Sequence, residues 1–161
     1  MKIELIDIKK LKADPENVRL HDDANLGAIK KSLSQFGQQK PIVVGKGNVV
    51  VAGNATLEAA KSLGWTKIAI VRTILAGKQA MAYAIADNKT SDLSFFDDSK
   101  LADQLKELQQ LSITDFESTG FDRSGLDELL ASLSIPANNK SIDEEAMTET
   151  ENECPKCGFK W

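Results

Sequence analysis

A glycine that joins a β-branched run to a helical pattern is the feature that most constrains how this chain can fold. The run Val49-Val-Val-Ala is typical of a strand, and Gly53 ends it. The residues that follow predict a helix over 54–63, which Gly64 ends. The apolar positions of that helix are Leu57, Ala60 and Leu63. The chain therefore contains a strand that leads directly into a helix.

Such a junction is suited to bind an anion. The first turn of a helix has backbone N–H groups without an intrahelical partner, and the helix macrodipole adds partial positive charge there. Gly53 has no Cβ, so a ligand can approach the backbone closely. Strand–glycine–helix junctions are also common as plain turns. The pattern alone leaves both a phosphate site and a simple turn open.

Short apolar patterns elsewhere complete an α+β arrangement. Strands are expected at 2–8, 41–45, 48–52 and 67–74, and helices at 26–36, 54–63 and 77–88. Lys46-Gly47, between the second and third strands, is typical of a hairpin turn. The first strand carries apolar residues on both faces, so its orientation stays open. We expect the fold class α+β, with a small mixed β-sheet packed by helices.

The pattern changes after residue 93 and again after residue 135. Residues 1–93 form the first predicted domain, and 94–135 carry two leucine-rich patterns that predict a helical extension. Residues 136–161 form a polar, acidic tail that we expect to be disordered. The second leucine-rich helix, over 124–133, contains no basic residue. Because a helix that reads DNA bases needs Arg, Lys, Asn or Gln side chains, we interpret both helices as core-packing.

The charge distribution argues against tight non-specific DNA binding. The net charge is −4, and the segment from Pro136 onward holds six of the 24 acidic residues but three of the 20 basic ones. Many Lys and Arg contacts drive non-specific duplex binding, so contact with nucleic acid is expected to be local or indirect. No apolar run approaches the ~20 residues that span a bilayer, and no signal-peptide pattern opens the chain. We expect a cytoplasmic protein without a membrane partner.

Two cysteines, Cys154 and Cys157, lie together in a C-P-K-C-G-F motif. This spacing is typical of half a zinc knuckle, whereas a structural Zn²⁺ takes four ligands. The missing ligands would come from a second copy in a homodimer or from a partner protein. Alternatively, the pair binds no metal tightly.

Four landmarks occur in an order that resembles the ParB N-terminal domain of the ParB/sulfiredoxin-like superfamily. They are Glu16-Asn17-Val18-Arg19, Phe36-Gly37-Gln38-Gln39-Lys40-Pro41, Ala52-Gly53-Asn54 with Ala59-Ala60, and Ile85-Ala86-Asp87-Asn88-Lys89. The resemblance runs from about Ile3 to Leu93 and implies the family's fold and nucleotide binding. Thr119-Gly-Phe-Asp122 and the C-P-x-C-G tail resemble ParB-like proteins of phages and mobile elements. Because those proteins accompany DNA methyltransferases, the resemblance implies such an enzyme, or another phage DNA-handling protein, as a partner.

The resemblance also implies a site for a nucleoside triphosphate, CTP or ATP, with Mg²⁺. Arg19 would approach the phosphates, and Glu16 or Asn17 would act in catalysis by positioning the metal or an attacking water. Gln38, Asp87 and Asn88 would contact the nucleotide.

The glycine-led helix departs from the family's pattern. Gly53 and Asn54 are followed by Ala55 and Thr56, where partition proteins carry an arginine pair that holds phosphates. Neutral hydrogen bonds are roughly half as strong as charge-assisted ones. We therefore expect a phosphate site that is weaker, altered or lost.

Each candidate also has a purely structural interpretation. Residues 16–19 are ordinary for a solvated loop, and Gln38 suits a turn. Asp87 and Asn88 suit a helix C-terminus with Asn88 as its left-handed cap. His21 is interpreted as a solvated side chain.

Three functions remain open from the sequence. The first is a nucleotide- or phosphate-binding module of a phage or mobile element, which acts in DNA binding, partition or DNA modification with a partner. The second is a metal-dependent enzyme for phosphoryl transfer, NTP hydrolysis or nuclease chemistry, centred on Glu16, Asn17 and Arg19. The third is a protein-interaction module with a vestigial pocket. A sulfiredoxin reaction is excluded, because it needs a cysteine thiolate and no cysteine precedes Cys154.

Overall fold

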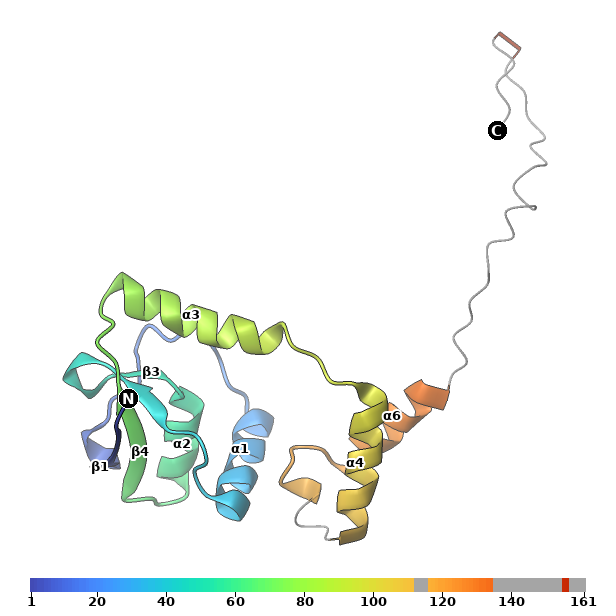
Figure 1. The fold of residues 1–161 in the computed structure, drawn as a ribbon, viewed down its shortest axis with the longest axis horizontal. Coiled ribbons are helices and arrows are strands. Elements are labelled where there is room, and N and C mark those ends of the chain that lie inside the picture. Colours follow the sequence, from blue (N-terminus) through green and yellow to red (C-terminus); the bar gives the residue numbers. More distant parts are fainter. Residues whose placement is uncertain (112–115, 135–154, 157–161) are drawn as a thin grey trace.

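The computed structural model describes residues 1–111, 116–134 and 155–156 (Figure 1). Its sheet has the strand order β1-β4-β2-β3, with β1 at Ile3–Asp7, β2 at Ile42–Val44, β3 at Val50–Ala52 and β4 at Lys67–Arg72. β1 runs antiparallel to β4, β4 runs parallel to β2, and β2 pairs antiparallel with β3. The predicted mixed sheet and its hairpin are therefore confirmed.

Helices pack on the sheet and continue beyond it. The helices are α1 (Asp23–Phe36), α2 (Asn54–Ser62), α3 (Lys78–Asp92), α4 (Asp98–Leu111) and α6 (Arg123–Ser134), with short 3-10 turns at Ile8–Lys10 and Lys46–Asn48. α1 and α2 lie side by side, and α3 lies along β3 (Figure 1). The described ranges contain no helix that is both long enough and apolar enough to cross a membrane.

The main core lies between the sheet and the pair α1 and α2. Ile68 and Ile70 of β4 are fully buried there, together with Leu57 of α2. The alternation of apolar and polar residues along each strand turns one face to this core. The opposite face carries Ile3 and Leu5 of β1, which are mostly exposed. β1 thus contributes Ile6, rather than Ile3, to the core.

A second, smaller core holds α4 and α6 together. It consists of Leu105, Phe116 and Leu126, all of which are nearly completely buried. Lys31 of α1 reaches this unit through an ion pair with Glu117, at 3.2 Å between Nζ and Oε2. The helices after residue 93 therefore pack on each other, as their leucine spacing predicts. Cys154 and Cys157 lie outside the described residues.

Candidate functional site

A cleft of about 140 Å³ lies at the strand–glycine–helix junction, and we name it the junction cleft. It brings together most of the residues that the sequence predicts for the site. The lining residues are Asn17, Arg19, His21, Val51, Ala52, Gly53, Asn54, Ala55, Asp87 and Asn88. Loop, α2 and α3 residues that are up to 71 positions apart in sequence thus face one small volume.

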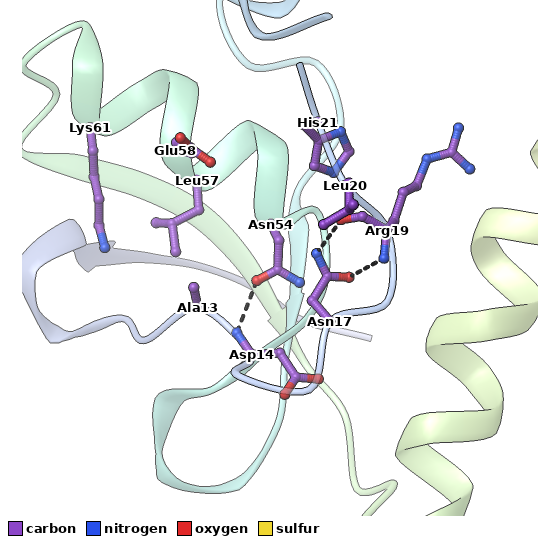
Figure 2. A pocket seen from close by; sticks show the side chains of 10 residues that line it. All are labelled: Ala13, Asp14, Asn17, Arg19, Leu20, His21, Asn54, Leu57, Glu58 and Lys61. Atoms are coloured by element: carbon purple, nitrogen blue, oxygen red, sulfur yellow. Dashed lines mark hydrogen bonds between the residues drawn. The ribbon is translucent and has the colours of Figure 1, made fainter. Parts of the chain in front are cut away.

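Two larger clefts flank the loop formed by residues 13–21. The first, the α2 cleft, has a volume of about 460 Å³ and lies between this loop and α2 (Figure 2). The second, the α3 cleft, has a volume of about 420 Å³ and lies between the loop, the β2–β3 hairpin and α3. Glu16 lines the α3 cleft, and Asn17 lines all three clefts.

The start of α2 offers unpaired backbone donors to the junction cleft. Gly53 precedes the helix with φ 97° and ψ 29°, and no side chain caps the helix. The N–H of Leu57 makes the first intrahelical bond, to the carbonyl oxygen of Gly53 at 3.0 Å. The N–H groups of Asn54, Ala55 and Thr56 therefore lack intrahelical partners. Together with the macrodipole, they form a region of positive potential.

Gly53 is needed for the packing of this junction. A Cβ at this position would lie 2.5 Å from Cγ2 of Ile42. Its φ of 97° is also a conformation that residues with a Cβ rarely adopt. The glycine thus lets the chain turn from β3 into α2 directly against the neighbouring strand.

Asn54 fastens the loop to this junction. Its Oδ1 accepts a hydrogen bond from the backbone N–H of Asp14 at 3.1 Å (Figure 2). Its Nδ2 donates to the carbonyl oxygen of Val50 at 3.3 Å. The sequence predicts a phosphate ligand at this position. In the structure the amide group of Asn54 instead joins the loop to the first residue of β3.

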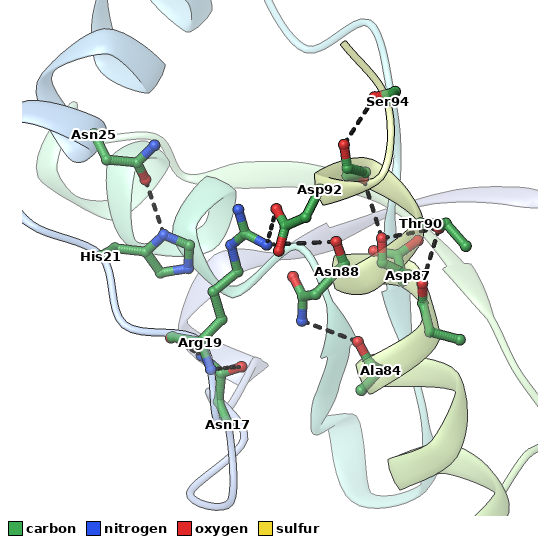
Figure 3. A network of polar contacts seen from close by, with 12 residues as sticks. Asn17, Arg19, His21, Asn25, Ala84, Asp87, Asn88, Thr90, Asp92 and Ser94 are labelled. Carbon is green, nitrogen blue, oxygen red and sulfur yellow. Dashed lines mark hydrogen bonds and ion pairs between the residues drawn. The ribbon is translucent and has the colours of Figure 1, made fainter. Parts of the chain in front are cut away.

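Arg19 bridges the loop and the last turns of α3. Its Nη1 donates to Oδ1 of Asp92 at 2.9 Å and lies 3.5 Å from the carbonyl oxygen of Asn88 (Figure 3). Asn17 shapes the loop at Arg19, because its amide accepts from the Arg19 N–H at 3.4 Å and donates to the Arg19 carbonyl at 2.9 Å. The guanidinium predicted to meet phosphates therefore lies beside the junction cleft and is paired with a carboxylate.

Asp87 and Asn88 lie inside α3, so the interpretation of Asn88 as a left-handed helix cap is wrong. The helix runs on to Asp92, and the Nδ2 of Asn88 donates to the carbonyl oxygen of Ala84 at 2.9 Å. Such bonds to the preceding turn let polar side chains continue a helix. Burial, and secondly the carboxylate of Asp87, raise the pKa of Tyr83 above its ordinary value.

Gln38 and Thr56 are not among the residues that line these clefts. Oε1 of Gln38 accepts from the N–H of Ala69 at 2.7 Å, and its Nε2 donates to the Ala69 carbonyl at 2.9 Å. β2 begins only at Ile42, opposite Ile70, so the amide of Gln38 takes the place of a strand partner at Ala69. The sequence assigns Gln38 to the nucleotide, whereas in the structure its side chain completes the hydrogen bonding of the sheet at Ala69.

The sequence reasoning missed Glu58 and Lys61, which line the α2 cleft together with His21. Asn54, Glu58 and Lys61 are spaced by four and three residues, which places them on one face of a helix. That spacing is the signal that could have found them. His21 is half-buried, and its Nδ1 lies 2.8 Å from Oδ1 of Asn25.

The described part of the chain contains no cluster of side chains that could bind a metal ion. Within residues 1–111, 116–134 and 155–156, no group of three or more His, Cys, Asp or Glu side chains is arranged to hold a metal ion. Glu16, expected to position Mg²⁺, is an exposed residue whose backbone N–H donates to Oδ1 of Asp14 at 3.0 Å.

Comparison with a solved ParB structure gives the same fold. ParB from Caulobacter crescentus, C-terminally truncated and in complex with CTP-γ-S, is 21% identical, with a TM-score of 0.70 over 85% of this chain and 81% of that one. The same protein complexed to the centromeric parS site is 20% identical, with a TM-score of 0.47 over 83% and 73% of the two chains. Sulfiredoxin from Arabidopsis thaliana is 22% identical, with a TM-score of 0.43 over 53% of this chain and 98% of that one.

Sequence comparison identifies the family. No curated protein matches the chain significantly. The ParB N-terminal domain matches residues 1–89, which is more than half of the 161 residues and includes every residue that lines the junction cleft. The chain therefore belongs to the ParB N-terminal domain family.

Proposed function

We propose that this protein binds a nucleoside triphosphate, with the phosphates at the start of α2 and beside Arg19. The observation that carries the proposal is the junction cleft, where unpaired N–H groups, Arg19, Asn17 and Asn88 converge. Caulobacter ParB, whose fold is similar, was solved with CTP-γ-S. This supports CTP as the first ligand to test, with ATP as the alternative.

The charges around the site bear on its affinity. Arg19 is the one guanidinium among the residues that line the junction cleft, and Asp87 contributes a carboxylate. Ala55 and Thr56 add backbone donors but no cation. A triphosphate therefore meets less positive charge than an arginine pair would supply, and we expect Mg²⁺ to strengthen binding by offsetting the ligand's charge.

We place the base in the α3 cleft. This cleft adjoins the phosphate region at Asn17 and Asn88, and its walls include Met81 and Ile85 of α3 and Val51 of β3. An apolar cavity with a few amide groups suits a planar base that needs both stacking and hydrogen bonds. A second proposal, hydrolysis of the bound nucleotide, rests on Asn17, which lines the junction cleft, whereas Glu16 lines only the α3 cleft.

The biological context is proposed from the family. Caulobacter ParB was also solved with its centromeric DNA site. We propose that this chain likewise acts on DNA, through a DNA methyltransferase or another phage DNA-handling partner, and that it forms a homodimer. Affinity capture on the purified chain, with and without CTP, followed by identification of the retained proteins, tests the partner.

Calorimetric titration tests the nucleotide site directly. Purified protein is titrated with CTP, ATP and ADP, each with and without Mg²⁺, and the titrations are repeated on Arg19→Ala. Micromolar binding of a triphosphate that Arg19→Ala abolishes supports the proposal, and turnover assays then test for hydrolysis. Arg72→Ala is the matched control, because Arg72 pairs with Glu4 at 3.2 Å and lines none of the three clefts. The absence of heat with every nucleotide contradicts the proposal.

A further inference from the structure

We propose that Asp92 is an internal competitor for the phosphate group. It holds the Arg19 guanidinium in the ligand-free protein, and a bound phosphate takes its place. The inference rests on the proposed nucleotide function and adds to it a residue that sets the affinity of the site. It also couples ligand binding to the way in which the last turns of α3 are held.

The contact between Arg19 and Asp92 has the geometry of the contact that a phosphate would make with Arg19. Nη1 of Arg19 lies 2.9 Å from Oδ1 of Asp92, as a charge-assisted hydrogen bond. Guanidinium groups bind carboxylate and phosphate oxygens through the same donors. Because Arg19 lines the junction cleft, a phosphate at the start of α2 approaches the group that Asp92 occupies.

The exchange is energetically accessible. The side chains of Arg19 and Asp92 are 39% and 51% exposed, and ion pairs with such exposure contribute little to stability. A phosphate carries more negative charge than one carboxylate and also receives the N–H groups of Asn54, Ala55 and Thr56. The ligand therefore competes favourably, and the pair with Asp92 lowers its affinity without closing the site.

The exchange also changes how the end of α3 is held. None of the residues of α3, Lys78–Asp92, is buried, so few apolar contacts fix this helix. The bonds from Arg19 to Asp92 and Asn88 connect its last turns to the loop. When Arg19 turns to a phosphate, the last turn of α3 loses this connection, and we expect it to open more often.

The first test is Asp92→Asn, which keeps the shape of the side chain and removes its charge. We expect the Kd for CTP with Mg²⁺ to fall by about two- to fivefold, which is the worth of an exposed ion pair. Asp103→Asn is the matched control, because Asp103 is an exposed acid of α4 that lines none of the three clefts. It makes the same change in net charge and should leave the Kd unchanged.

A second pair of measurements separates competition for Arg19 from simple repulsion of the ligand. The double variant Arg19→Ala/Asp92→Asn should bind as weakly as Arg19→Ala alone. In amide hydrogen exchange, residues 88–93 should exchange faster when CTP binds the natural protein. In Asp92→Asn they should exchange fast with and without the ligand.

The outcomes distinguish the two proposals. If the natural protein binds CTP and Asp92→Asn binds it equally or more weakly, the role of Asp92 is refuted while the nucleotide site stands. Recovered affinity in the double variant also refutes it, because Asp92 would then act on the ligand directly. If neither the natural protein nor Asp92→Asn binds any nucleotide, the proposed function fails and the inference fails with it. Binding by Asp92→Asn alone supports both.

Discussion

Replacing Gln38 with alanine distinguishes a structural role from a ligand-binding role at this position. The sequence assigns Gln38 to the nucleotide site, whereas in the structure its amide pairs with both backbone groups of Ala69. Nε2 also lies 3.1 Å from the carbonyl oxygen of Lys40. Gln38→Ala therefore removes three hydrogen bonds. It leaves the backbone N–H and carbonyl groups of Ala69 without these partners.

The expected loss follows from these contacts. A hydrogen bond contributes about 1 kcal/mol net, and a backbone group left without a partner costs more when it is out of water. Gln38 and Ala69 are both half-buried, so water replaces part of what is lost. We expect Gln38→Ala to lower the free energy of unfolding by about 2 kcal/mol. CTP binding by the folded variant should be unchanged.

Urea denaturation followed by circular dichroism measures the stability, and calorimetry on the folded variant measures CTP binding. Gln39→Ala is the control, because the exposed neighbour bonds only within its own turn, to the carbonyl oxygen of Phe36. It should cost less than about 0.5 kcal/mol, as for an ordinary surface position. The reasoning is refuted if Gln38→Ala costs as little as its neighbour, or if it abolishes CTP binding at unchanged stability.

Three further predictions concern other parts of the molecule. Gly53→Ala places a Cβ 2.5 Å from Cγ2 of Ile42 at a positive φ, so it should cost about 2–4 kcal/mol in urea denaturation; a loss below about 1 kcal/mol would contradict this packing. Leu105→Ala should cost about 3 kcal/mol and speed amide exchange in α4 and α6, whereas equal effects throughout the sheet would count against a separate second core. Tyr83, the one tyrosine of the chain, should titrate by ultraviolet absorbance with a pKa above 10, and Asp87→Asn should lower that pKa only in part because burial is the larger cause. Since folding favours the neutral phenol, its contribution to stability is present below about pH 10 and lost as the pH rises through the folded-state pKa; a pKa at or below 10 would contradict this.

The sheet and the helices that pack on it are predictable from the sequence, because their signals are local. Alternation of apolar residues marks the strands, and Gly37 and Gly64 follow the helices that they end. Ile42, Val50 and Ile70, expected in the sheet, lie in its buried core. The junction at Gly53 is predictable for the same reason.

Side-chain roles at the site are less predictable, because they depend on contacts between distant segments. From the sequence, Gln38 is expected to contact the nucleotide. In the structure β4 extends beyond β2 at Ala69, and Gln38 bonds the backbone there. From the sequence, Asn54 is expected to hydrogen-bond a phosphate. In the structure its side chain instead bonds the backbone of Asp14, 40 positions earlier in the chain. The pairing of Arg19 with a carboxylate 73 positions away likewise has no local signal.

The length of α3 shows a different limit. Asn88 and the polar residues after it have weak helix propensity, so a helix end at Asn88 is a reasonable local prediction. In the structure Thr90 and Asn88 donate to carbonyl groups one turn earlier, and the helix continues to Asp92. These side chains satisfy their own hydrogen bonds inside the helix, which propensity alone does not capture.

The most direct test of the central claim is the response of individual backbone amides to CTP with Mg²⁺, measured by two-dimensional NMR. If the phosphates lie at the start of α2, the amide signals of Asn54, Ala55 and Thr56 shift most, and Arg19→Ala weakens that response. If CTP leaves these three signals unmoved, or shifts only signals far from the junction cleft, the claim that this junction is a phosphate site is contradicted.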